Sequence, residues 1–115
     1  MKTYRQFDVV VVPFPFTDKT ATKKRPALVL SSEPFNTEIH HSVMAMITTA
    51  SHSAWPLDVT IANLKDAGLK TSSIIRMKLF TIDQMLILKH LGHLHPQDQK
   101  SVESALNSLL SRDGS

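Results

Sequence analysis

The stretch KKRPALVLSS (residues 23–32) joins three consecutive cations to an uninterrupted apolar run. Residues 26–32 have the length and the aliphatic content of a buried strand. Pro26 is expected at the first position of that strand, because proline cannot donate a ladder hydrogen bond. The three cations then lie immediately before the first residue of the strand. Either they keep a hydrophobic strand soluble, or they present Arg25 to a phosphate group.

The neighbouring sequence alternates short apolar runs with polar connections. The β-branched run DVVVVP (residues 8–13) predicts a strand, and the polar residues that follow it predict a loop. Further strands are predicted for residues 42–49, 55–61 and 73–81, with a turn or a single helical turn over residues 33–41. Since short strands are expected to close on themselves, this pattern predicts a mainly β protein with a C-terminal helix, built as a small barrel.

The last third of the chain favours helix. Asp83 is expected to cap a short helix that reaches Leu91 and ends at Gly92. Pro96 suits the first turn of a final helix, whose apolar residues fall on one stripe: Val102, Ala105, Leu106, Leu109 and Leu110. This stripe and both apolar faces of residues 42–49 offer more apolar surface than a small barrel hides, so a homodimer is expected.

The composition limits the class of protein. A chain of 115 residues predicts a single domain over residues 1–115. The sequence has no cysteine, which excludes disulfides and thiolate metal sites and suits a reducing cytoplasm. No apolar run approaches the roughly 20 residues of a membrane span, and Asp8 and Pro13 bound the valine run too closely for a signal peptide. The net charge of +3 is compatible with a polyanionic partner.

Five sequence blocks occur in a fixed order along the chain. They are DVVVVPF, KKRPALVLS after a polar loop, ITT at the end of a strand, WPLDV, and TID before the last elements. In this order and spacing the sequence resembles the MazF/PemK toxins of bacterial type II toxin–antitoxin modules over nearly its whole length. The resemblance implies an SH3-like barrel, shared with the CcdB toxins, and usually a homodimer.

The resemblance also implies an activity. Members of this family are sequence-specific endoribonucleases that cleave single-stranded RNA, including mRNA, without a metal or other cofactor. They leave a 2′,3′-cyclic phosphate and a free 5′-hydroxyl. Each is neutralised in the cytoplasm by a cognate antitoxin with an acidic disordered tail, and the two form a DNA-binding complex. Matching the motifs residue by residue assigns catalysis to Arg25 and Thr48. Thr49 stands next to Thr48, so a shift of one position stays open.

The chemistry of these residues agrees with the assignment only in part. Attack by the RNA's own 2′-hydroxyl needs a base, a donor to the leaving 5′-oxygen and stabilisation of the phosphorane. The guanidinium of Arg25 matches two phosphate oxygens, but it stays protonated and is a poor base. His40, His41 and His52, in loops beside the predicted strand 42–49, are candidate bases, with ordinary surface histidines as the alternative. Adjacent histidines point apart, so no metal site is expected.

Further side chains are candidates for binding RNA. Lys19 in the polar loop, and Lys23 and Lys24 just before the predicted strand, are expected to attract phosphates. Trp55 either stacks on a base or packs in the core. Arg76 and Lys78 are expected on one strand face, and Lys78 stands where the best-known relatives carry glutamine, which affects the RNA sequence preference. His90, His93 and His95 are expected at the surface.

Two other functions compete with RNA cleavage. A CcdB-like gyrase-inhibiting toxin would have the same fold, but that activity depends on a Trp-Gly-Ile ending, whereas this chain ends SRDGS. A non-catalytic SH3-like module that binds RNA or peptide is the second alternative. Arg25 and Thr48 count against it, although binding proteins also use arginine and threonine.

Overall fold

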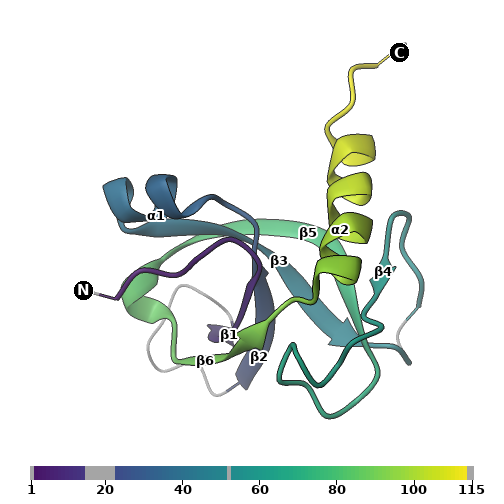
Figure 1. Cartoon of the computed structure of the whole chain (residues 1–115), viewed down its shortest axis with the longest axis horizontal. Helices are drawn as coiled ribbons and strands as arrows, with labels where there is room; N and C mark the ends of the chain where they lie inside the picture. The colour runs from purple at the N-terminus through teal and green to yellow at the C-terminus, as the bar shows by residue number, and fades with distance from the viewer. Residues whose placement is uncertain (1, 15–22, 52, 114–115) are drawn as a thin grey trace.

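The computed structural model describes residues 2–14, 23–51 and 53–113. Within these ranges the elements follow one another as β1 (Asp8–Phe14), β2 (Lys23–Val29), α1 (Glu33–Ile39), β3 (His41–Thr49), β4 (Val59–Thr60), β5 (Ser73–Asp83), the 3-10 turn η1 (Gln84–Leu86), β6 (Lys89–His93) and α2 (Pro96–Leu109). The strands form one antiparallel sheet in the order β4-β5-β3-β2-β1-β6. The sheet curls into a half-barrel, with α1 near one end and α2 near the other (Figure 1). The predicted class, a mainly β SH3-like barrel with a C-terminal helix, is confirmed.

Two apolar clusters fill the two sides of the curled sheet. Alternation along each strand explains this arrangement, since successive side chains point to opposite faces. On β1, for example, Val9 belongs to one cluster, whereas Val10 and Val12 belong to the other. The larger cluster includes Val102 and Ala105 of α2, so the predicted apolar stripe of the last helix packs on the sheet through its first half. Neither helix of the described residues is both long and apolar enough to span a membrane.

Pro26 does not begin its strand, so that prediction is wrong. Strand β2 starts at Lys23, and Pro26 pairs with Val11 of β1. Pairing with β3 begins only at Ala27, so at Pro26 the strand has a ladder neighbour on one side alone. Such an edge setting accepts a residue without an N–H. As a consequence, the three cations lie on the strand itself and not in the loop before it.

The helix predicted from Asp83 to Leu91 is also wrong. The Asp83 carboxylate does accept a hydrogen bond from the Met85 amide, but the helical geometry lasts for a single 3-10 turn. The chain then extends as β6 and pairs with the outer edge of β1, whose backbone groups need partners. Gly92 lies within this strand. The position requires glycine, because a β-carbon there would collide with the backbone of Asp66.

The strand predicted for residues 55–61 is mostly a turn. Only Val59–Thr60 pairs, against Ile75 and Ile74 of β5. The preceding residue Leu57 has a φ of 67°, which interrupts the extended backbone. The strands predicted for residues 42–49 and 73–81 are confirmed as β3 and β5, and the helix predicted at Pro96 is confirmed as α2.

Candidate functional site

One pocket gathers most of the residues that the sequence singles out. Its volume is about 200 Å³, and it lies where the end of β1 and the start of β2 meet the last residues of β3 and the middle of β5. Its walls are formed by Phe14, Arg25, Met46, Ile47, Thr48, Trp55, Arg76 and Lys78. Two predicted catalytic residues and three predicted RNA-binding residues therefore share a single cavity, although they come from four separate segments.

Arg25 and Thr48 enter this pocket from adjacent strands. Arg25 is half-buried, and its Cζ lies 5.4 Å from the centroid of the Phe14 ring, so the aromatic face supports the guanidinium. Thr48 is half-buried and lines the pocket. Thr49 is exposed instead, and its hydroxyl lies 3.1 Å from that of Ser51. Of the two adjacent threonines, Thr48 is therefore the one with access to the cavity.

Arg76 lines the pocket, but its charge is already paired. Its Nη2 and Nε lie 3.0 and 3.2 Å from the two carboxylate oxygens of Asp58, and both side chains are almost buried. The hydrogen bond from Arg76 outweighs burial and holds the pKa of Asp58 below its ordinary value, together with a bond from the Trp55 amide. Asp58 was missed as a site residue, although the WPLDV block contains it. Its partner lies 18 residues away in the sequence.

A bulge in β5 shapes the same wall. Ala45 of β3 pairs with Leu79, whereas the next residue, Met46, pairs with Arg76. Two residues of β5, Lys78 among them, therefore have no Cα partner on β3. Bulges of this kind redirect side chains and are frequent beside functional sites. Lys78 is exposed at this bulge and lines the pocket, so its cation faces any ligand there.

The remaining predicted RNA contacts lie around the pocket or cannot be placed. Lys23 and Lys24 are exposed at the start of β2, next to Arg25, but they do not line the cavity. Lys19 and His52 lie outside the described residues. Trp55 is 45% exposed and belongs to the pocket wall, so it is not a core residue.

Two of the candidate bases lie far from the pocket. His40 ends α1 in a left-handed conformation, with φ at 58°, and His41 begins β3. Since a strand rises about 3.3 Å per residue, the seven steps from His41 to Thr48 span about 23 Å along β3. Within a single chain, neither histidine therefore lies at this pocket.

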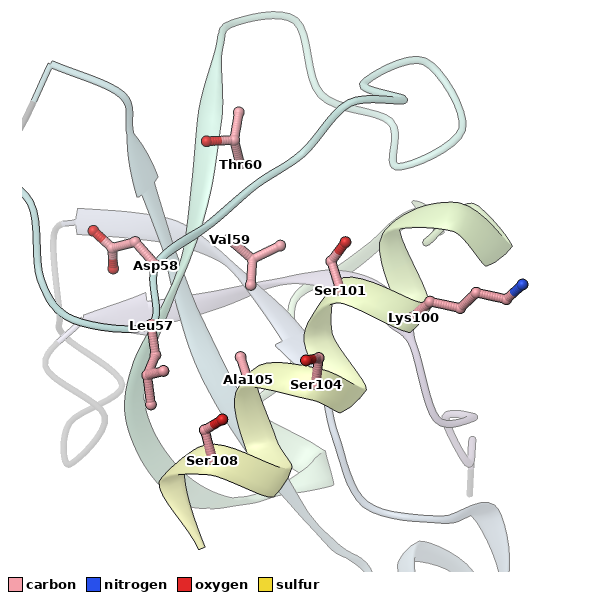
Figure 2. A pocket seen from close by; sticks show the side chains of 9 residues that line it. All are labelled: Leu57, Asp58, Val59, Thr60, Lys100, Ser101, Ser104, Ala105 and Ser108. Carbon is pink, nitrogen blue, oxygen red and sulfur yellow. The ribbon is translucent and has the colours of Figure 1, made fainter. Parts of the chain in front are cut away.

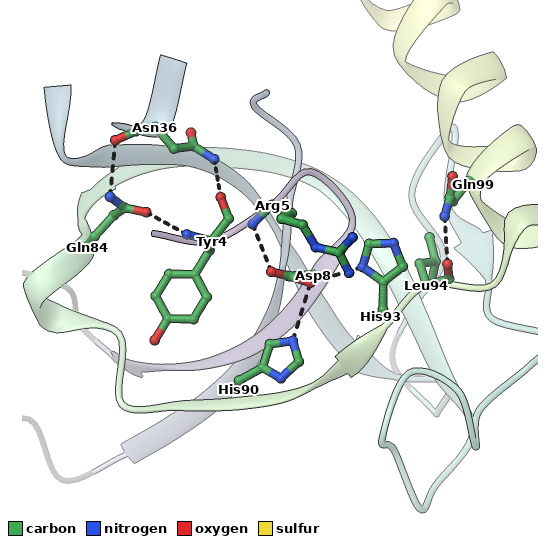
Figure 3. Close-up of polar contacts among 9 residues, drawn as sticks. All are labelled: Tyr4, Arg5, Asp8, Asn36, Gln84, His90, His93, Leu94 and Gln99. Carbon is green, nitrogen blue, oxygen red and sulfur yellow. Dashed lines mark hydrogen bonds and ion pairs between the residues drawn. The ribbon is translucent and has the colours of Figure 1, made fainter. Parts of the chain in front are cut away.

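A polar cluster that the sequence did not predict lies at the other end of β1 (Figure 3). The buried Asp8 carboxylate has one oxygen 2.9 Å from His93 Nδ1 and 3.3 Å from His90 Nε2, and its other oxygen accepts from the Arg5 amide. Burial would raise the pKa of Asp8, but the bonds from His93, Arg5 and His90 outweigh it and lower that pKa. The cluster fastens β6 to β1, about 20 Å along the strand from Phe14.

A larger groove of about 570 Å³ is lined by residues 57–60 and by residues of the last helix (Figure 2). It runs between β4 and α2, and hydroxyl groups of Ser101, Ser104 and Ser108 line its helical wall. The Asp58 side chain points away from the helix there. Because no predicted catalytic residue opens into this groove, the smaller pocket is the candidate site. Within the described ranges, no group of three His, Asp or Glu side chains is placed to hold a metal ion.

The fold and the pocket together define a small half-barrel protein with a cationic site on the sheet. A family model supplies the identity: the chain belongs to the PemK-like, MazF-like toxins of type II toxin–antitoxin systems, with residues 5–110 matched. A comparison with curated protein sequences found no match.

Solved structures agree with this family. A MazE–MazF structure from Deinococcus radiodurans is 20% identical with a TM-score of 0.76, over 97% of this chain and 100% of that one. An endoribonuclease in complex with its cognate antitoxin, from a mycobacterial species, is 17% identical with a TM-score of 0.74, over 96% and 95% of the two chains. Toxin MazF-mt6 of Mycobacterium tuberculosis is 19% identical with a TM-score of 0.73, over 92% and 98%. At such identities the likeness establishes the fold.

Proposed function

We propose that this chain is a sequence-specific endoribonuclease toxin that cleaves single-stranded RNA, including mRNA, and is neutralised by a cognate antitoxin. One observation carries the proposal: Arg25 and Thr48 line the same pocket, beside an exposed tryptophan and the cation of Lys78. The family membership and the endoribonuclease activity of one structural relative support it. Because its substrate is mRNA, the proposed enzyme acts in the cytoplasm.

The proposed reaction needs no metal ion. The 2′-oxygen of one nucleotide attacks the adjacent phosphorus, and the bond from phosphorus to the 5′-oxygen of the next nucleotide breaks. The 2′-hydroxyl gives up its proton to a base and the leaving 5′-oxygen takes one up from solvent, so the products are a 2′,3′-cyclic phosphate and a free 5′-hydroxyl. Arg25 clamps two non-bridging oxygens of the phosphorane and donates a hydrogen bond toward the leaving oxygen. The Thr48 hydroxyl hydrogen-bonds a phosphate oxygen or the 2′-hydroxyl.

The base that removes the 2′-hydroxyl proton is the open part of this reaction. The described titratable side chains of the pocket are all cationic: Arg25, Arg76 and Lys78. Arginine remains protonated at ordinary pH, so neither arginine is suited to that role. Of the three histidines considered above, His52 is the one left to test, by its substitution with alanine and asparagine.

The proposed antitoxin binds through an acidic, initially disordered segment that folds on the toxin. Lys23, Lys24 and Lys78 are exposed around the pocket and attract such a segment as they would attract RNA. A bound antitoxin segment and bound RNA therefore exclude each other, which a competition assay measures directly.

The toxin is proposed to act as a homodimer, although β3 offers less free apolar surface than expected. Met44 and Ala45 are fully buried on opposite sides of the strand, whereas Val43 lines an open groove. This apolar groove has a volume of about 360 Å³ and lies between α1 and the end of α2. Phe35 and Leu110, at its rim, are 42% and 73% exposed. A second copy of the chain provides matching apolar surface.

The test is cleavage of single-stranded RNA by purified protein in excess EDTA, with single-stranded DNA of the same sequence as the control. Cleavage of the RNA alone is expected, with a cyclic phosphate on the upstream fragment. A 5′-phosphate on the downstream fragment, or loss of activity with the chelator, contradicts the proposed reaction. Binding of RNA without cleavage would instead indicate a non-catalytic binding module.

A further inference from the structure

The turn that carries Trp55 contains a strained residue. The Asp58 amide lies 3.4 Å from the Trp55 carbonyl and closes a four-residue turn, with Pro56 second and Leu57 third. Leu57 has a φ of 67°, a backbone conformation that glycine adopts readily and that a leucine seldom adopts. Such a conformation persists only where the surrounding contacts enforce it.

Asp58 supplies those contacts. Its Oδ2 accepts one hydrogen bond from the Trp55 amide at 2.9 Å and another from Arg76 Nη2 at 3.0 Å. The same Arg76 nitrogen donates to the Ser53 carbonyl at 2.5 Å. The side chains of Asp58 and Arg76 are only 12% and 11% exposed, so solvent weakens this pair little. The turn is thereby fastened to β5 at Ser53, Trp55 and Asp58.

These contacts place an aromatic ring at the pocket. The Arg76 Cζ lies 5.0 Å from the centroid of the Trp55 ring, so the guanidinium also supports the indole. Trp55 nevertheless stays 45% exposed and shares the pocket wall with Arg25 and Thr48. An immobilised and partly exposed indole beside a phosphate-binding arginine is the arrangement on which an unpaired base stacks.

The charge of Arg76 is balanced by Asp58, and its Nε and Nη2 already have acceptors. We propose that Arg76 does not bind RNA phosphate through its charge, and that Asp58 and Arg76 are positioning residues. They hold Trp55 as a stacking platform for a base next to the cleaved phosphate. This inference rests on the proposed function, since it specifies how the same pocket binds single-stranded RNA.

The first half of the proposal can be measured without RNA. Trp55 is the only tryptophan, so its emission reports on this turn alone. In Asp58→Asn, the fluorescence anisotropy of Trp55 should fall and its quenching by acrylamide should increase, with Asp58→Glu closer to the wild type. Asp66→Asn, which changes an exposed aspartate elsewhere, is the matched control. Unchanged anisotropy and quenching in folded Asp58→Asn would overturn the positioning role.

The second half needs an RNA that binds without reacting. The probe is an oligoribonucleotide of the mapped cleavage sequence with a 2′-O-methyl group at the attacked position. Trp55→Leu and Asp58→Asn should each bind it about ten- to a hundredfold more weakly. If Asp58 acts through Trp55, the double variant should bind no more weakly than Trp55→Leu alone, which a purely additive effect on folding would not produce.

The alternative for Arg76 predicts the opposite sign. If Arg76 bound phosphate through its charge, Asp58→Asn would release that charge, tighten binding and steepen its salt dependence. That result would overturn the proposal. A wild type that cleaves RNA, with unchanged affinity in Asp58→Asn, would overturn the platform alone. A wild type that neither cleaves nor binds RNA would overturn the proposed function as well.

Discussion

Arg25 and Thr48 line one pocket just beyond the point where β2 and β3 stop pairing. Ala27 and Met46 are the last residues paired between the two strands, and Arg25 and Thr48 each lie two residues further on. Both side chains therefore stand where the strands no longer share a hydrogen-bonded ladder. A guanidinium and a hydroxyl held by neighbouring strands are fixed relative to each other, which stabilisation of a transition state requires.

Thr48→Val should reduce RNA cleavage more than Thr49→Val. Valine keeps the shape of threonine and removes the hydroxyl. Losing a hydrogen bond to a charged phosphate costs about 1.5–3 kcal/mol, so the Thr48 variant should lose about ten- to a hundredfold in rate. Thr49 is exposed and lies outside the pocket, so its variant should stay within about threefold of the wild type. Single-turnover cleavage rates compare the two, and a larger loss in Thr49→Val would reverse the assignment.

Lys23 and Lys24 should contribute to RNA affinity through charge alone. Each lysine that neutralises a phosphate adds about 0.7 to the slope of log affinity against log salt concentration for single strands. The double alanine variant should therefore lower that slope by about 1.4 and weaken binding most at low salt. Lys100→Ala, an exposed lysine of α2, is the control. Equal slopes in all three proteins would place the RNA elsewhere.

Asp8 should make the free energy of unfolding depend on pH in the acid range. Its pKa is lowered in the folded protein, so the stability that it contributes is complete above the unfolded pKa, about 3.9. That stability is lost as the pH falls below about 4. Urea unfolding of the wild type should therefore show a decrease in unfolding free energy between pH 5 and pH 3. Asp8→Asn should be less stable at pH 5 and should show a smaller decrease. A parallel decrease in both proteins would exclude Asp8 as its source.

Leu110→Glu should separate the proposed dimer into monomers. Leu110 is 73% exposed in a single chain, so the change costs a monomer little, whereas a charge buried between two copies is costly. Light scattering at micromolar concentration should give about twice 12.8 kDa for the wild type and 12.8 kDa for the variant. Met85→Glu, at a residue that is 72% exposed and does not line the groove, should remain a dimer. A monomeric wild type would contradict the dimer itself.

Much of the fold follows from local pattern, because apolar alternation depends on neighbouring residues. That pattern correctly predicts β1, β3 and β5. It fails where distant pairing decides the structure. The segment from Asp83 to Leu91 begins with a capping aspartate and contains three leucines, which favours helix, but its last residues pair as a strand with the open edge of β1. No local signal distinguishes these two outcomes.

The residues of the candidate site also fall into two groups, those that the sequence predicts and those that it does not. The family motif identified Arg25 and Thr48, and the structure brings both to one pocket. The motif could not reveal that Asp58 pairs with Arg76, because this contact depends on the register and the bulge of β5. It also could not reveal that Asp8 and His93, 85 residues apart, are partners. Contacts between distant segments become visible only once the sheet is assembled.

The most direct test of the proposed chemistry is the cleavage rate of Arg25→Lys compared with Arg25→Ala, with circular dichroism as the control for folding. Lysine keeps the charge of arginine but cannot present two donors to two phosphate oxygens. Losing such a transition-state contact costs about 3–4 kcal/mol, so both variants should be about a hundred- to a thousandfold slower than the wild type. Near-wild-type cleavage by folded Arg25→Lys would contradict the clamp and leave Arg25 as a surface charge.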